Sequence, residues 1–315
     1  MRGLKVPKRE GEKVRQTLIQ QELLLSRYKI KKDEFFIYFP VKEGIPGYDV
    51  VECSFEEKVQ PPESLKKFGI SSFDIIGDIA IVDIPEDVQD QKNEIAQALL
   101  TRKPIRTVVQ KRSKVQGEYR TRTFEYLAGE QKSETIHTEY GLKFKVDINT
   151  VYFNPRLATE RLRIAQKVEA HEIVTDMFCG VGPFSLMIAK YSEAEKIYSI
   201  DINPEAIQLL KENIKLNKIT NVHPILGDSK KEIAKIGSSD RIIMNLPQKA
   251  FEFLPEALQY GRIIHYYRIT SDLQGEVERI KALATKIKPI EILQYCTVKS
   301  YAPDMELYRI DIFSG

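Results

Sequence analysis

From residue 151 onward, short apolar runs alternate with segments of helical period, and few folds can accommodate this order. Runs typical of buried strands occur at residues 173–178, 196–201, 222–228 and 240–247, with helical segments at 156–168 and 204–217. Strands separated by helices form parallel, doubly wound sheets. We therefore predict an α/β domain over residues 151–315.

The end of this region follows a different pattern. A strand at 261–267 and a helix at about 272–286 are followed by two long strand candidates, 290–302 and 306–313, with a turn near Pro303 and Asp304. An antiparallel pair at the end of a parallel sheet is typical of Rossmann-like class I methyltransferases rather than of dinucleotide dehydrogenases.

Two smaller α+β domains are predicted before residue 151, over residues 1–60 and 61–150. The first combines a helix at 10–24 with a strand at 35–41, and the paired prolines in segment 59–68 indicate a linker. For the second domain we expect a strand pair at 73–85, a helix at 87–100 and β-rich stretches at 105–111, 119–129 and 136–148.

Composition predicts a soluble, globular, cytoplasmic protein. The chain of 315 residues is 42% hydrophobic and 30% charged, and no apolar run approaches the roughly 20 residues needed to span a bilayer. The N-terminus lacks the apolar core of a signal peptide. Its three cysteines and four histidines are scattered, so we expect neither disulfides nor a metal site.

Positive charge is concentrated in two segments, although the net charge is only +3. Residues 1–32 hold ten Lys or Arg against three Glu, and residues 102–122 hold eight against Glu118 alone. Such segments are compatible with a nucleic-acid partner. They are equally compatible with the solvated faces of a Lys- and Glu-rich protein, so charge alone leaves the choice open.

A glycine loop follows the first strand of the predicted sheet. In "DMFCGVGPFS", Gly180 and Gly182 allow the backbone to approach a ligand closely, and Pro183 can open the next helix. The loop is neither the G-x-G-x-x-G of nicotinamide enzymes nor a phosphate-binding P-loop. On its own it could also be a tight turn that binds no ligand.

Acidic and amide side chains end the next strands. Asp201, Asp228 and Asn245 follow successive strands, and ligands of open α/β sheets bind at such ends. One acid at a strand end commonly caps a helix, but a series predicts a nucleoside site. Acids without cationic side chains suit a ligand that lacks phosphate and carries a positive sulfonium, namely S-adenosylmethionine. The residues expected to bind it are Asp176, Phe178, Gly180, Val181, Gly182, Asp201, Ile202, Asp228, Ser229, Asn245 and Pro247.

These motifs together resemble a known family. The string "VYFNPRLATERLRIAQKV…DMFCGVGPFS…IDINPEAI…ILGDS…DRIIMNLP…IIHYY…VKSYAP" closely resembles the archaeal and eukaryotic tRNA (guanine-N1)-methyltransferases that modify the purine at tRNA position 37. "LKVPKREGEKVRQ" and "GEYRTRTFEYLAGE" extend the resemblance over nearly the whole chain. The N-terminal segment favours the archaeal branch, which in some organisms also methylates the wyosine precursor 4-demethylwyosine.

The resemblance implies roles for residues whose positions alone are ambiguous. Glu160 matches the general base that removes the guanine N1 proton, although it could be a surface acid paired with Arg163. Arg120 matches an arginine that supports catalysis, while Arg120 and Arg122 could also be exposed strand cations. Asn245 is expected to contact the purine edge, and Arg122, Tyr152 and Asn154 to help hold the base.

The implied partner is tRNA, contacted at its anticodon stem-loop and its outer corner by a monomeric enzyme without a membrane partner. A wyosine-pathway aminocarboxypropyltransferase and a noncatalytic tRNA-binding protein are the alternatives. The Asn245-Leu246-Pro247 strand end favours methyl transfer over the former. His265 is expected to pack at a strand end. Tyr266 and Tyr267 are expected to pack in the core, and a position at the border of the pocket is the alternative.

Overall fold

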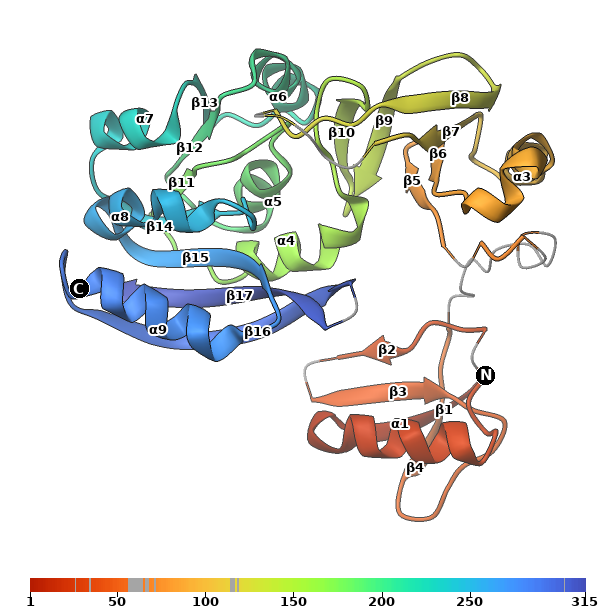
Figure 1. The fold of residues 1–315 in the computed structure, drawn as a ribbon. Helices are drawn as coiled ribbons and strands as arrows, with labels where there is room; N and C mark the ends of the chain where they lie inside the picture. The colour runs from red at the N-terminus through yellow and green to blue at the C-terminus, as the bar shows by residue number, and fades with distance from the viewer. Residues whose placement is uncertain are drawn as a thin grey trace. The chain divides into compact units, whose positions relative to one another are not determined.

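The computed structural model describes residues 1–25, 27–33, 35–55, 65, 68–70, 72–113, 117, 119–302 and 304–315. The chain divides into two compact units, Met1–Lys67 and Phe68–Gly315 (Figure 1). The predicted linker at 59–68 falls almost entirely outside the described residues, as does Pro303 of the predicted C-terminal turn.

The described part of the first unit is an antiparallel sheet packed against one helix. The sheet has the order β2-β3-β1-β4, with β1 (Arg2–Pro7), β2 (Lys31–Lys32), β3 (Phe36–Pro40) and β4 (Asp49–Glu52). Helix α1 (Gly11–Gln20) directs Val14 and Leu18 at the apolar face of the sheet, where they meet Leu4, Val6 and Phe39.

Helix α1 ends earlier than the predicted Leu24. The backbone turns at Glu22, whose φ is +55°, and the N–H groups of Leu23 and Leu24 both donate to the carbonyl of Leu18. Leu24 then forms a bridge with Val41 beside β3. The two leucines thus leave the helix in order to pack against the sheet.

The second unit begins with a four-stranded sheet of order β5-β6-β7-β8. Its strands are β5 (Asp74–Ile76), β6 (Ile79–Val82), β7 (Thr107–Lys111) and β8 (Phe124–Gly129). Helices η2 (Glu86–Gln91) and α3 (Lys92–Leu100) connect the parallel pair β6 and β7. Strand β8 begins at Phe124, so the expected strand from residue 119 was too long and Arg120 and Arg122 precede it.

The second unit continues with a hairpin and a seven-stranded sheet of order β13-β12-β11-β14-β15-β17-β16. The hairpin strands are β9 (Glu134–Glu139) and β10 (Leu142–Asp147). The sheet strands are β11 (Ile173–Asp176), β12 (Lys196–Asp201), β13 (Val222–Leu226), β14 (Ser239–Met244), β15 (Gly261–Thr270), β16 (Ile290–Ala302) and β17 (Met305–Ser314). Strands β11 to β15 are parallel and β17 is antiparallel to both its neighbours, which confirms the predicted Rossmann-like fold.

Helices cover both faces of this sheet (Figure 1). They are η3 (Pro155–Leu157), α4 (Ala158–Ala165), α5 (Pro183–Tyr191), α6 (Pro204–Leu216), α7 (Ser229–Ile236), α8 (Ala250–Tyr260) and α9 (Leu273–Ala284). One buried cluster joins α4, α5 and α6, and a second joins α7, α8 and α9. No helix among the described residues is long and apolar enough to cross a membrane.

The hairpin is tied to the large sheet by buried polar contacts. Arg161 of α4 pairs with Glu139 of β9 at 2.6 Å, and both side chains are 2% exposed. The Asn213 side chain of α6 accepts from the Lys145 N–H at 2.7 Å and donates to the carbonyl of Val181 at 3.1 Å. The first buried cluster also includes Ile79 and Phe144, so its apolar core runs from β6 into the large sheet. Because this core is continuous, the predicted domain boundary at residue 150 stays a prediction.

We predict that Glu139→Gln lowers the free energy of unfolding by about 3 kcal/mol, because it leaves the buried Arg161 charge without its counter-ion. Chemical denaturation of the purified protein measures this. Glu130→Gln is the matched control, since Glu130 is 52% exposed in its pair with Arg106 and should cost less than about 1 kcal/mol. Equal losses in the two variants would contradict the stabilising role of the buried pair.

Candidate active site

The candidate site is formed where parallel strands end together. Asp176, the last residue of β11, pairs with Ser199 of β12 and with Ile243 of β14. Asp201 ends β12 two residues beyond Ser199, and Asn245 follows β14 directly. The register thus brings three predicted site residues, distant in the sequence, to the carboxyl edge of one sheet.

The two glycines of the loop after β11 serve different purposes. Both have positive φ, +53° at Gly180 and +88° at Gly182. A Cβ on Gly182 would lie 2.3 Å from Leu210 Cδ1, whereas a Cβ on Gly180 would meet nothing closer than the Tyr152 carbonyl at 3.8 Å. Gly182 therefore lets α5 and α6 pack closely, and only Gly180 borders open space as expected for a ligand. Val181 is fully buried, so only its backbone could face a ligand.

Asp201 orders the loop and borders the site. Its Oδ2 accepts from the Gly180 N–H at 2.7 Å, and its Oδ1 accepts from the Asn203 N–H at 2.9 Å. Burial raises the pKa of Asp201, and these backbone donors oppose the rise. Each carboxylate oxygen retains a second lone pair, which fits the predicted role of accepting ribose hydroxyls. Ile202 beside it is 38% exposed, as a ring-packing residue requires.

Asp176 offers an unused acceptor. Its Oδ2 accepts from Ser185 Oγ at 2.8 Å, while its buried Oδ1 has no hydrogen-bond partner among the described residues. Burial raises the pKa of Asp176 to about 7 and the charge of Asp201 adds to the rise, while the Ser185 hydroxyl and the Phe178 N–H oppose it. A buried acceptor such as Oδ1, which closes no hydrogen bond within the described residues, is costly unless a ligand satisfies it. The site therefore fits a cationic cofactor such as S-adenosylmethionine.

The residues expected around the adenine have local contacts of their own. Asp228 caps α7, since its Oδ1 accepts from the Lys230 N–H at 3.0 Å, which leaves Oδ2 for a ligand. The Ser229 hydroxyl is committed to the carbonyl of Met177. Phe178 packs edge-on against Phe253, with ring centroids 4.9 Å apart. Of these side chains, Asp228 and Phe178 remain suited to a ligand.

Glu160 lies in the first turn of α4 and is 3% exposed. Its Oε2 accepts from Arg163 Nη1 at 2.6 Å, which is the pairing considered from the sequence. Its Oε1 accepts from the Tyr267 hydroxyl at 2.9 Å and from Arg309. Glu160 is therefore not a surface acid, because three donors hold it beneath the surface.

Arg120 and Tyr152 lie together, as the predicted substrate group requires. The Arg120 backbone has a φ of +56° in a turn, and its guanidinium lies 5.0 Å from the centre of the Tyr152 ring. The buried Nε atoms of Arg120 and Arg122 have no hydrogen-bond partner among the described residues. The interpretation of these arginines as exposed strand cations was wrong. Asn154 instead caps η3 by accepting from the Arg156 N–H.

The sequence did not show how Glu160 is held. Tyr267 was expected to pack in the core, with a place at the border of the pocket as the alternative, and Arg309 was not singled out. His265, expected at a strand end, lies inside β15, which continues to Thr270, and its Nδ1 lies 2.6 Å from Asp311. The available signal was polar residues at alternate positions, His265 and Tyr267 in one strand and Arg309 and Asp311 in another.

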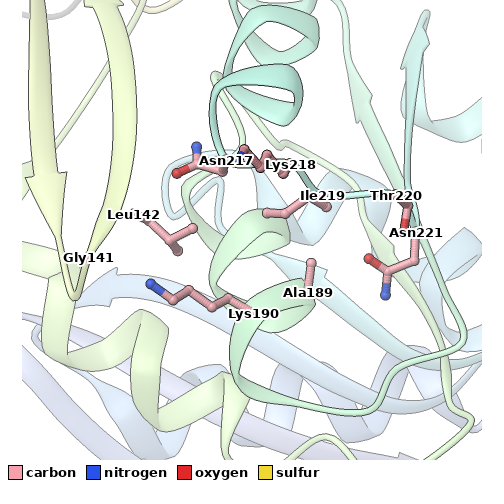
Figure 2. Close-up of a pocket in the computed structure, with 9 residues that line it drawn as sticks. All are labelled: Gly141, Leu142, Ala189, Lys190, Asn217, Lys218, Ile219, Thr220 and Asn221. Carbon is pink, nitrogen blue, oxygen red and sulfur yellow. The ribbon is translucent and has the colours of Figure 1, made fainter.

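A separate cavity lies at the other edge of the sheet. It has a volume of about 310 Å³ and is lined by Gly141, Leu142, Ala189, Lys190 and residues 217–221 (Figure 2). Asn221 precedes the first residue of β13, so this cavity is at the amino ends of the strands. Ligands of such sheets bind at the carboxyl ends, and none of the predicted site residues lines the cavity. Among the described residues, no group of three potential metal ligands is found.

Comparisons with known proteins agree along the chain. The TRM5/TYW2 methyltransferase domain matches residues 135–293, the TYW2 N-terminal domain matches 55–132, and the tRNA methyltransferase 5 N-terminal domain matches 3–49. The tRNA (guanine(37)-N(1))-methyltransferase Trm5b of Pyrococcus abyssi is 45% identical over 98% of both chains. The tRNA 4-demethylwyosine(37)-methyltransferase Taw21 of Saccharolobus solfataricus is 38% identical, and the match covers 64% of this chain and 79% of that protein. The solved complex of aTrm5 and tRNALeu covers 99% of both chains at 37% identity, with a TM-score of 0.73.

The two loop glycines form a matched pair for mutation. Gly182→Ala should lower the free energy of unfolding by about 3 kcal/mol, because it adds overpacking against Leu210 to backbone strain. Gly180→Ala should cost only about 1 kcal/mol, from strain alone, yet weaken binding of S-adenosylmethionine about tenfold. Denaturation and titration calorimetry test both. A Gly182 variant as stable as the Gly180 variant would contradict the assigned packing role.

Proposed function

This chain belongs to the TRM5/TYW2 methyltransferase family, and from that premise we infer that it is a tRNA (guanine37-N1)-methyltransferase that uses S-adenosylmethionine. The observation that carries the inference is the position of Glu160. Tyr267, which donates to Glu160, is the residue after Tyr266, and Tyr266 pairs with Met244, the last residue of β14. Glu160 therefore lies at the carboxyl edge of the sheet, near Asn245. A buried carboxylate thus lies beside the residues proposed to hold the cofactor, which we call the cradle: Asp176, Gly180, Asp201 and Asp228.

The cradle residues would hold the cofactor in distinct ways. Asp201 would accept hydrogen bonds from the ribose hydroxyls of the cofactor, and Asp176 Oδ1 would face the positive charge of the cofactor. Gly180 leaves space for the part of the cofactor that joins the ribose to that charge. When bound, S-adenosylmethionine supplies an electrophilic methyl group, which leaves its sulfur as the bond to guanine N1 forms. Phe178, Ile202 and Asp228 would surround the adenine.

Glu160 takes the proton that must leave N1. The N1 lone pair of neutral guanine is tied into the ring, so transfer is faster when a base removes the N1 proton as the new bond forms. Loss of this proton shifts negative charge toward guanine O6. Arg120, whose Nε has no hydrogen-bond partner among the described residues, and Asn245 would donate to the purine edge.

The substrate requires a wide positive surface as well as a site. The protein binds tRNA, and the target base must leave its stack to reach a buried carboxylate. We propose that the basic segment 102–122 contacts phosphates of the anticodon stem-loop and that domain 1–60 contacts the outer corner. We further propose that the enzyme acts as a cytoplasmic monomer.

A second substrate is proposed for the same site. The similarity to a 4-demethylwyosine methyltransferase supports methylation of that base at position 37.

We predict that tRNA transcripts with G at position 37 acquire one methyl group on N1 and that transcripts with A acquire none. Incubation with labelled S-adenosylmethionine and nucleoside mass spectrometry measure this, and tRNA carrying 4-demethylwyosine tests the second substrate. Transfer of an aminocarboxypropyl group would identify the rival transferase. Binding of tRNA without any transfer would identify a noncatalytic protein.

Glu160→Gln should lower the single-turnover rate at saturating tRNA by about 100-fold or more, which is the usual contribution of a general base. Cofactor binding should persist, because Glu160 does not belong to the cradle. Glu169→Gln is the control, because Glu169 is exposed and lies beyond the end of α4, and this variant should react at the parental rate. Equal rates for Glu160→Gln and the parent would exclude Glu160 as the base.

A further inference from the structure

A row of buried polar side chains lies behind Glu160. In the antiparallel pair of β15 and β17, His265 is opposite Asp311 and Tyr267 is opposite Arg309. All four are at most 2% exposed. Residues opposite each other, and residues two apart in a strand, share a face of the sheet. These four side chains therefore form one polar strip beneath α4.

The far end of the strip is fixed by Arg241. This arginine binds Glu172 through two hydrogen bonds of 2.7 and 2.9 Å, and its Nη1 lies 2.8 Å from His265 Nε2. Because arginine can only donate, Nε2 must accept, and Nδ1 then donates to Asp311. Burial lowers the pKa of His265, in agreement with this neutral form.

The near end of the strip holds Arg309 in a single orientation. Its Nε donates to Asp311 Oδ1 at 2.8 Å, and its Nη1 donates to Glu160 Oε1. Gln294 donates to the other oxygen of Asp311 at 2.7 Å. Asp311, which His265 and Gln294 hold in place, thus orients the Arg309 guanidinium toward the Glu160 carboxylate.

The two oxygens of Glu160 have unequal surroundings. Oε1 is bound by Tyr267 and Arg309, both buried, whereas Oε2 is bound by Arg163, whose side chain is 49% exposed. Buried ion pairs are often no more stabilising than apolar residues of the same size, so stability alone does not explain this strip. The different surroundings of the two Glu160 oxygens indicate a role in positioning this carboxylate.

We propose that Arg309 is a positioning residue that anchors Oε1 of Glu160 and leaves Oε2 as the oxygen that receives the N1 proton. Arg163 turns toward solvent to vacate Oε2 when the base enters. As N1 gains the methyl group its proton passes to Oε2, and release of that proton to solvent restores the carboxylate. This inference rests on the proposed function.

The charged and titratable groups around Glu160 determine the expected pH effect. They are Arg163 on its own helix, Tyr267 from β15, Arg309 and Asp311 from β17, and the Cys296 thiol from β16. The two arginines and the Tyr267 hydroxyl donate to the Glu160 carboxylate, whereas Asp311 is a like charge behind Arg309. Arg309→Gln removes one of the two cations at the carboxylate, so the rise of rate with pH should move to higher pH.

The test is the pH profile of single-turnover methyl transfer at saturating tRNA and cofactor. Arg309→Gln should move the acid limb upward by about one pH unit, so that about tenfold of rate is lost at low pH and recovered at high pH. Arg309→Lys, which keeps the charge, should restore most of the parental profile. Tyr267→Phe, which removes only a neutral donor to Oε1, should move the limb in the same direction by less.

Tyr266→Phe is the matched control, because it also removes a buried hydroxyl donor from β15 but one that binds Glu276 and does not touch Glu160 or the strip. It should leave the acid limb in place. A loss of rate in Arg309→Gln that is the same at every pH would overturn the inference while leaving the proposed function intact. If Arg309→Gln does not fold, an unshifted limb in Tyr267→Phe overturns it instead. A parent enzyme that transfers no methyl to N1 would overturn both.

Discussion

The parallel register of β12, β11 and β14 is the constraint on which the site depends. It sets Asp176 level with Ser199 and Ile243, so that strand ends about 70 residues apart in the sequence meet at one edge. Side chains alternate between faces along a strand, so a shift of one residue would turn each of them away. The glycine loop and the start of α5 follow the end of β11, and the cap of α7 follows the end of β13.

A second constraint is the cost of burying charge. The apolar clusters on both faces of the sheet stabilise the fold, yet β15 and β17 place an arginine, an aspartate and a histidine among them. Every one of these groups is hydrogen-bonded, which is what makes their burial tolerable. Violations of the apolar pattern are expected at functional sites, and this one ends at Glu160.

Features encoded by adjacent residues could be predicted from the sequence. The apolar runs that became β11 to β14, the turn at Gly180 and the acids at the strand ends all depend on local order. The need for glycine at position 182 could not be predicted, because it arises from the close packing of Leu210, which lies on another helix. Likewise, Arg309 reaches Glu160 across 149 positions, and only strand pairing brings the two together. Arg120 was placed in a strand because its Arg-Thr alternation imitates one, whereas its left-handed backbone is a property of the turn.

The central claim is that the carboxyl edge of the sheet binds the methyl donor. A crystal structure of the protein with S-adenosylmethionine tests it most directly. The account predicts the ribose hydroxyls on Asp201, the backbone of Gly180 against the ligand, and the positive charge of the ligand facing Asp176 Oδ1. A ligand in the cavity beside Asn217 and Asn221, with Asp176 still lacking a partner, would contradict it.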